Sequence, residues 1–477
     1  MRRTLPVFLL LAGCTVGPNY SRPAVPGAEA DWSSTAGTAA VDLSPWGTLG
    51  DPVLDGLLRT AVVANLDLRE ADARLQEARA ARDAAAGGRL PALDANASAT
   101  EQQLSANGQL PVNSIPGFNR RFSLFDGGFD ASWELDLWGG TRRSVEAADR
   151  RVTAAAARRH DTLLQIVAEV ARSYASLRGS QAILASTLAD ARAQADIAGL
   201  VHQQFVAGEA SRFDDARAEA QARNTAALIE PVRADIRAAT SQLALLTGRP
   251  PEALSSLVED HRPLPPTPAI VGVGLRSDLL RRRPDILAAE ADLAAATSDI
   301  GVQTAQLFPS VSLIGSVGQQ ARAAGDLTSG DSLRFSVGPS IRWPIFSGGR
   351  LRAQIRSADA RADAAAARYE KAVLAAFADS ETAINRYAAA LARAREQDAA
   401  RAASAIALDL ARQRYRAGED NLLTLLDAQS SYTASDRSAT DAQAQAFQAY
   451  AALIKALGGG WSDATNRDVT TEVAGQP

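Results

Sequence analysis

The chain has 477 residues, of which 46% are hydrophobic and 22% are charged, and its formal net charge is -4. This length supplies ample material for a core, and the slightly acidic balance excludes the basic field that a nucleic-acid-binding surface needs. The chain contains a single cysteine, Cys14, so a disulfide within the chain is excluded.

The amino terminus predicts a secretory signal over residues 1–13. A basic start at Arg2 and Arg3 precedes a short apolar run that ends in the sequence LAGC. This ending resembles the bacterial lipobox, which implies cleavage before Cys14 and lipid attachment to that residue. Two or more acyl chains on one residue give a stable anchor, so we expect residues 14–50 to be a lipidated extension. After the signal, no run of 18 apolar residues predicts a transmembrane helix.

The first half of the remaining chain predicts helix, strand, strand and a very long helix. Leucines recur on one side between Asp51 and Gly87, which favours a helix, and residues 93–100 alternate apolar and polar side chains. The stretch FDASWELDLWGG, residues 129–140, has the same alternation. Residues 141–205 contain no proline and are rich in alanine, arginine and glutamine. They predict a rod of about 100 Å that packs along its length against other helices.

The second half repeats this order after a proline-rich linker at 262–270. A helix is predicted to begin near Leu275, with Pro284 close to its start, followed by a strand at 309–318. The stretch FSVGPSIRWPIFSGG, residues 335–349, alternates again and ends in a glycine pair, and 350–415 predicts a second rod. The chain is therefore predicted to be a tandem duplication, with one repeat at 51–261, the other at 271–460, and a polar tail at 461–477.

Each rod is predicted to end in a tight turn that leads into a return helix. Gly208 and Gly418 fit the position after a helix, where a left-handed backbone is favourable only for glycine. Ser211 and Asp214 match a capping box that starts the first return helix.

The alternating strands have one apolar and one polar face. Apolar residues occupy every second position, and we expect Asp130, Glu134 and Asp136 to face water. In lipid a sheet must close on itself, and four strands are too few to close a barrel, so several chains must share one. The residues expected to face lipid are Phe129, Trp133, Leu135, Phe335 and Trp343.

The chain resembles the TolC-type outer membrane factors, in particular their lipidated OprM/CusC/NodT-like branch. The stretches that carry the resemblance span nearly the whole chain in the family's order: LAGCTVGPNYSRP, WGTLGDPVLDGLL, ASWELDLWGG, LRSDLLRRRPDILAAEADLAAA, DIGVQTAQLFPSVSL, RWPIFSGGRLRAQI and YRAGEDNLLTLLDAQ. The resemblance implies an α+β membrane protein, four strands of which join a shared 12-stranded barrel while its long helices join a 12-helix periplasmic tunnel.

The same resemblance implies partners and a location. It implies a homotrimer in the outer membrane of a Gram-negative bacterium, in contact with outer membrane lipid. Its periplasmic tip would dock onto an adaptor protein, also called a membrane fusion protein. An inner-membrane pump, commonly of the proton-driven resistance-nodulation-division (RND) class, would complete a tripartite efflux system that exports small molecules.

The resemblance also assigns a gate. The family's inner constriction falls on LLTLLD, with Leu423 and Asp427 as the inward-facing positions. These residues are four apart and share one face of a helix, so three copies would form an apolar ring and a carboxylate ring. Where TolC itself has a tip arginine that locks the closed state, this chain has Asp420, so that locking network is not expected here.

Other functional classes find less support in the sequence. The three histidines show no metal-ligand spacing, and no Walker loop, GxSxG or HExxH occurs, so we expect no enzyme, no metal and no cofactor. The exit duct of a type I protein secretion system shares the conduit and stays open as an alternative. A periplasmic adaptor would have one helical hairpin where this chain predicts two. A structural coiled-coil lipoprotein would have no use for acidic-apolar strands.

Overall fold

The computed structural model describes residues 15–27, 29–33, 41–42, 45–107, 117, 119–260 and 262–460. The chain divides into two compact units. The first comprises Met1–Pro23, Leu75–Ala155 and Ala289–Tyr369, and the second comprises Ala24–Arg74, Ala156–Ala288 and Glu370–Pro477. The signal, the lipidation residue Cys14 and the tail 461–477 are predictions that lie outside the described residues.

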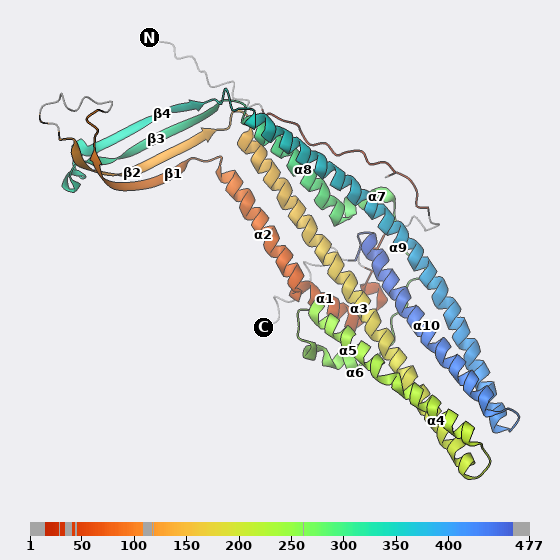
Figure 1. The fold of residues 1–477 in the computed structure, drawn as a ribbon. Helices are drawn as coiled ribbons and strands as arrows, with labels where there is room; N and C mark the ends of the chain where they lie inside the picture. The colour runs from red at the N-terminus through yellow and green to blue at the C-terminus, as the bar shows by residue number, and fades with distance from the viewer. Residues whose placement is uncertain are drawn as a thin grey trace. The chain divides into compact units, whose positions relative to one another are not determined.

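Both halves of the chain have the same order of elements (Figure 1). The first half contains η1 (Gly47–Leu49), α1 (Pro52–Ala64), α2 (Leu66–Gly87), β1 (Ala92–Gln103), β2 (Arg121–Leu135), α3 (Gly140–Val206), α4 (Arg212–Ala227), α5 (Ile229–Leu246), η3 (Pro251–Leu254) and α6 (Ser255–Glu259). The second contains α7 (Arg276–Arg282), α8 (Pro284–Ala305), β3 (Ser310–Ala321), η4 (Ala324–Asp326), η5 (Gly330–Ser332), β4 (Leu333–Arg342), α9 (Arg350–Arg416) and α10 (Leu422–Ala456). The tandem repeat predicted from the sequence is therefore present.

The four strands form one antiparallel sheet in the order β1-β2-β3-β4. Phe129 of β2 lies opposite Ala95 of β1 and Val317 of β3, and Val317 lies opposite Phe335 of β4. Because residues opposite each other in an antiparallel ladder point to the same face, the register gathers the apolar positions of all four strands on one face. These positions include Leu93, Ala95, Ala97, Ala99, Phe125, Phe129, Ala131, Trp133, Leu135, Val311, Leu313, Val317, Phe335, Val337 and Ile341.

The other face of the sheet is polar over most of its area. The register brings Asp130 of β2 opposite Asp94 of β1 and Ser316 of β3, which in turn lies opposite Ser336 of β4. Phe122, Leu124 and Ile314 are apolar exceptions on this face. The alternation read from each strand alone is thus continuous across the sheet.

The long helices α3 and α9 each have 67 residues, which corresponds to about 100 Å of helix. In the second unit, α3 packs closely against α10: a Cβ added to Gly179 would lie 2.9 Å from the Cβ of Ala444. Tyr174 and Leu177 on α3 are completely buried there, as is Phe447 on α10. Small residues let the helix backbones approach, and larger ones fill the space beside them. In the described part of the chain, no helix is both long enough and apolar enough to cross a membrane.

The glycine pairs lie at the start of each long helix, where the chain was predicted to become a rod, but the strands end several residues before them. Strand β2 ends at Leu135, and α3 begins at Gly140. Asp136, which we expected on the water face of this strand, lies beyond it. Its carboxylate accepts hydrogen bonds from the backbone N–H groups of Thr141 (3.1 Å) and Arg142 (2.9 Å) and so caps the start of α3. In the second half, β4 ends at Arg342, so Trp343 lies just outside the strand.

Two predicted helices are each broken in two. Asn65 separates α1 from α2, because its side-chain oxygen accepts from the N–H groups of Asp67 and Leu68 and caps a new helix. Its amide nitrogen donates to the Leu246 carbonyl at 2.8 Å. Pro284 begins α8 instead of lying near the start of one continuous helix, because a residue before proline, here Arg283, is pushed out of the helical region.

Candidate functional site

The apolar face of the sheet is exposed in the single chain. Phe129 is 54% exposed and Phe335 is 76% exposed, while Leu135 is half-buried. From Phe125 to Leu135 this face covers ten residue steps of β2, or about 33 Å at the rise of a strand. That length matches the span of a transmembrane strand.

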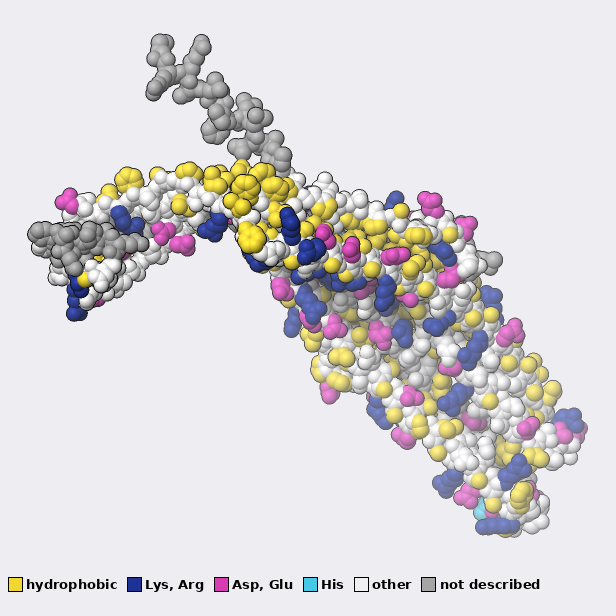
Figure 2. Space-filling model, turned by 45° about the horizontal axis from the view of Figure 1, so that its top comes forward, with side chains coloured by type: hydrophobic (Ala, Val, Ile, Leu, Met, Phe, Trp, Pro, Cys, Tyr) yellow, Lys and Arg dark blue, Asp and Glu magenta, His cyan; other side chains and the backbone are white. Residues whose placement is uncertain are grey.

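Tryptophans lie at the end of this apolar band where the strands give way to helices. The indole N–H of Trp133 donates to the Arg89 carbonyl at 3.0 Å, and that of Trp343 donates to the Leu307 carbonyl at 3.2 Å. Ile345 and Phe346, which follow Trp343, are 87% and 90% exposed. Figure 2 shows hydrophobic side chains gathered in this region. Amphipathic rings with a polar handle suit the boundary between lipid and water.

The polar face of the sheet carries hydrogen bonds between strands. Arg334 of β4 makes two bonds to Asp126 of β2, at 2.6 and 2.9 Å, and Gln320 of β3 donates to the same carboxylate at 2.8 Å. Asn96 of β1 donates to Asp130. These side chains satisfy one another, so this face can border water.

The two tip turns have the same geometry. Gly208 has φ of 79° and Gly418 has φ of 73°, both in the left-handed region. The N–H of Glu209 donates to the Gln204 carbonyl at 2.8 Å, and the N–H of Glu419 donates to the Arg414 carbonyl at 3.0 Å. These are the bonds of a Schellman motif, in which a glycine reverses the chain after a helix.

The return helices begin with side-chain caps. Ser211 and Asp214 form a capping box at the start of α4. At the start of α10, the side-chain oxygen of Asn421 accepts from the Thr424 N–H at 3.0 Å. Each cap satisfies a backbone donor that the helix itself leaves unpaired.

The predicted gate residues lie on the exposed face of α10, one turn after its cap. Leu423 is 50% exposed and Asp427 is also exposed, whereas Leu425 and Leu426 between them are buried. Leu425 belongs to a small apolar cluster with Leu408 and Ala411 of α9. The exposed pair is therefore held on a helix that is anchored on its opposite side.

A buried polar network at the tip was not predicted. Gln429 of α10 is 3% exposed; its amide donates to Asp190 of α3 at 2.8 Å and its oxygen accepts from Arg412 of α9 at 2.7 Å. The network joins three helices of the second unit. The only local signal was a polar residue on the inward side of α10, and its partners lie too far away in sequence to be identified from spacing.

Other charges at the tip are paired within their own hairpins. Asp420 stands at the position where TolC has its locking arginine. Its carboxylate forms an ion pair with Arg414 at 2.9 Å. On the first hairpin, Asp215 is 8% exposed and contacts His202 Nδ1 at 3.0 Å and Arg212 at 3.6 Å. Over the described residues, no group of three or more histidine, cysteine, aspartate or glutamate side chains could hold a metal ion.

Comparisons with known proteins agree on one family. The family model described as "Outer membrane efflux protein" matches residues 57–249 and 275–459. Nodulation protein T of Rhizobium leguminosarum bv. trifolii is 32% identical over 471 residues, with 97% of this chain and 98% of the relative covered. The solvent efflux pump outer membrane protein SrpC of Pseudomonas putida is 31% identical, with coverages of 97% and 99%.

The outer-membrane channel OprN, whose structure has been solved, is 36% identical to this chain in sequence. It superimposes with a TM-score of 0.83 over 94% of this chain and 100% of its own. The repeat, the two-faced sheet and the long helices are thus shared with a known outer-membrane channel. Since the family model covers most of the chain and the relatives align nearly end to end, the chain belongs to the outer membrane efflux protein family.

Proposed function

We propose that the chain is the outer membrane exit duct of a tripartite efflux system and that three copies build one pore. The observation that carries this proposal is the four-stranded sheet, whose register separates an apolar face from a polar face. In the described residues β1 and β4 have no strand on their outer edges. Lipid tolerates no open edge, and the smallest known spanning barrels have about eight strands. Three copies would supply twelve strands and would enclose the polar face.

The relatives support partners on the inner side. SrpC is named as the outer membrane protein of a solvent efflux pump. We propose that the helical tips dock onto a periplasmic adaptor and that an RND-class inner-membrane pump supplies the energy. The sequence offers no catalytic motif, so we propose no enzymatic activity for the chain itself. Co-purification of the tagged chain with the adaptor and pump of its own cell tests the partners.

We further propose that Cys14 carries the lipid anchor, on the basis of the LAGC sequence. The anchor would add to the membrane contact of the sheet without replacing it, because the exposed apolar face of the sheet can itself contact lipid. A Cys14→Ser protein should therefore take up no radiolabelled palmitate and should still reach the outer membrane. Equal palmitate uptake by the mutant would exclude this lipidation site.

A deletion strain tests the transport function. We expect it to accumulate a fluorescent efflux substrate such as ethidium, and we expect the wild-type gene to restore export. A variant with Phe129→Arg, in the middle of the apolar band, should fail to restore export, since an arginine on the lipid face near the bilayer midplane costs about 2 to 4 kcal/mol. Normal dye export in the deletion strain together with loss of a secreted protein would favour the type I secretion duct instead.

A further inference from the structure

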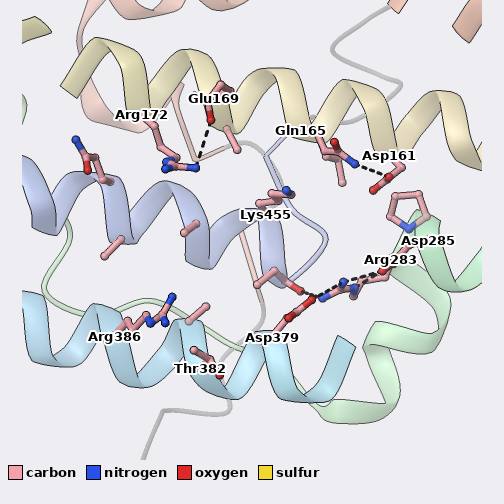
Figure 3. Close-up of a pocket in the computed structure, with 18 of the residues that line it drawn as sticks. Asp161, Gln165, Glu169, Arg172, Arg283, Asp285, Asp379, Thr382, Arg386 and Lys455 are labelled. Carbon is pink, nitrogen blue, oxygen red and sulfur yellow. Dashed lines mark hydrogen bonds and ion pairs between the residues drawn. The ribbon is translucent and has the colours of Figure 1, made fainter. Parts of the chain in front are cut away.

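A cavity of about 720 Å³ lies in the second unit, bounded by α3, α9, α10 and the junction of α7 with α8 (Figure 3). This volume falls within the range of small-molecule sites. Its walls are charged or polar, and small side chains leave the space between them open. The alanines that line it are Ala168, Ala383, Ala449, Ala452 and Ala456.

One cation in the cavity is fully committed to structural contacts. Arg283 donates to Asp285 at 2.7 Å and to Asp379 of α9 at 3.4 Å. It also donates to the carbonyl of Ala456, at the end of α10, at 3.1 Å. Figure 3 shows this arginine between the two carboxylates. Arg283 therefore offsets one of these two negative charges and fixes the end of α10 at the level of Asp379.

Two other cations are not committed. Lys455 of α10 and Arg386 of α9 line the cavity, and neither has an ion pair or a side-chain hydrogen bond with the described residues. Arg172 differs from them, because it pairs with Glu169 at 3.3 Å. An ammonium and a guanidinium without partners offer strong, charge-assisted donors to an anion.

The remaining carboxylate, Asp161, competes only weakly for these cations. It accepts from Gln165 at 2.6 Å, and it has no arginine or lysine within ion-pair distance in the described chain. Burial and the nearby Asp285 carboxylate raise the pKa of Asp161 above its ordinary value, although the hydrogen bond from Gln165 and the charges of Lys455 and Arg283 act in the opposite direction. Asp161 thus holds its proton to a higher pH than an exposed aspartate does.

Lys455 and Arg386 lie at different levels along α9. Lys455 precedes Ala456, which Arg283 ties to the level of Asp379. Arg386 is seven residues further along α9, which is about 10 Å of helix. We propose that the cavity binds an elongated organic dianion, with one anionic group on Lys455, the other on Arg386, and its hydrocarbon middle along the alanines.

A series of dicarboxylates tests this site by isothermal titration calorimetry on the full-length protein in neutral detergent. Azelate, with a carboxylate at each end of a nine-carbon chain, is long enough to reach both cations. We expect it to bind about tenfold or more tightly than malonate, which is too short, and than azelate monomethyl ester, which has the same length and one charge fewer.

Substitutions of the two cations test whether azelate binds in this cavity. Lys455→Met and Arg386→Met should each reduce azelate affinity to that of the monomethyl ester. The matched control is Lys371→Met, which removes the chain's other lysine from an exposed position on α9 outside the cavity and should bind azelate normally. Equal affinities for azelate and its ester, unchanged azelate affinity in both cavity variants, or tighter binding of 1,9-diaminononane would overturn the proposal. The measurement involves no transport, so its outcome is independent of the exit-duct function.

Discussion

Two glycines on the polar face of the sheet, Gly128 of β2 and Gly318 of β3, lie directly opposite each other. A Cβ on Gly128 would stand 2.4 Å from the Val317 carbonyl oxygen, and one on Gly318 would stand 2.6 Å from the Gly127 carbonyl oxygen. Real Cβ atoms do not come this close to backbone, so neither position has room for a side chain. Each glycine faces the other across the ladder. A methyl group at either site would force the two strands apart.

We therefore expect Gly128→Ala to weaken the sheet by about 1 to 3 kcal/mol, the usual cost of overpacking. The assembled protein should lose its oligomeric band at a lower temperature in a heated gel series. Gly338→Ala on β4 is the control, because no atom lies within 4 Å of the Cβ it would add. An unchanged dissociation temperature for Gly128→Ala would mean that the strands can separate there at no cost.

At the level of elements, the tip turns depend on backbone conformation more than on side-chain contacts. The backbone of Gly418 adopts the left-handed conformation, yet a Cβ added to this residue would meet no atom within 4 Å. A side chain there is opposed only by the left-handed conformation, which costs roughly 1 to 2 kcal/mol in any other L-residue. The turn between α9 and α10 is therefore sensitive to substitution although it is exposed.

The same substitution should have opposite effects at two glycines. Gly418→Ala should speed hydrogen exchange of the tip amides about fivefold to thirtyfold, from that cost. Gly199→Ala, inside α3 and also free of neighbours within 4 Å, should slow local exchange, because alanine favours helix over glycine. Slower tip exchange in Gly418→Ala would contradict the role assigned to this turn.

Periodic patterns in the sequence were enough to predict the rods, the two-faced strands and the repeat. What they could not predict came from tertiary contacts. Asn65 caps a new helix through a local bond to Asp67, but its second bond, to Leu246, 181 residues away, could not be read from spacing. Gln429 is buried by partners on two other helices, and Gly128 is constrained only through the register with β3. The break at Pro284 differs, since the proline was visible and its effect on Arg283 was a local one.

For the candidate site, the sequence was enough to predict which residues share a helix face. It was not enough to predict which side chains are buried or which partners they contact. The exposure of Leu423 and Asp427 on one face agrees with their spacing on α10, but whether they form a gate is still a prediction. Asp215, on the other hairpin, would have seemed a neutral control for the gate. Its burial and its contacts with His202 and Arg212 make it unsuitable. Asp409 of α9 is exposed and bonds only to Gln413 of its own helix among the described contacts, so it is the better control.

At the scale of the whole molecule, the proposed function requires several copies of the chain to close around one water-filled pore. In the described residues of a single chain, the apolar face is exposed and neither outer edge of the sheet pairs with another strand. Three copies would bring three Asp427 carboxylates and three Leu423 side chains together at the tip. Converging carboxylates attract cations and hold back anions, and converging leucines narrow the aperture. A resting pore should therefore conduct poorly and should prefer cations.

Single-channel conductance in planar lipid bilayers tests this claim most directly. We predict discrete steps for the wild type, larger steps for Leu423→Ser and Asp427→Ala, weaker cation selectivity for Asp427→Ala alone, and wild-type behaviour for Asp409→Ala. Wild-type conductance and selectivity in both gate variants would place the constriction elsewhere in the tunnel. The absence of discrete conductance in the assembled wild type and in both opened variants would contradict the shared pore itself.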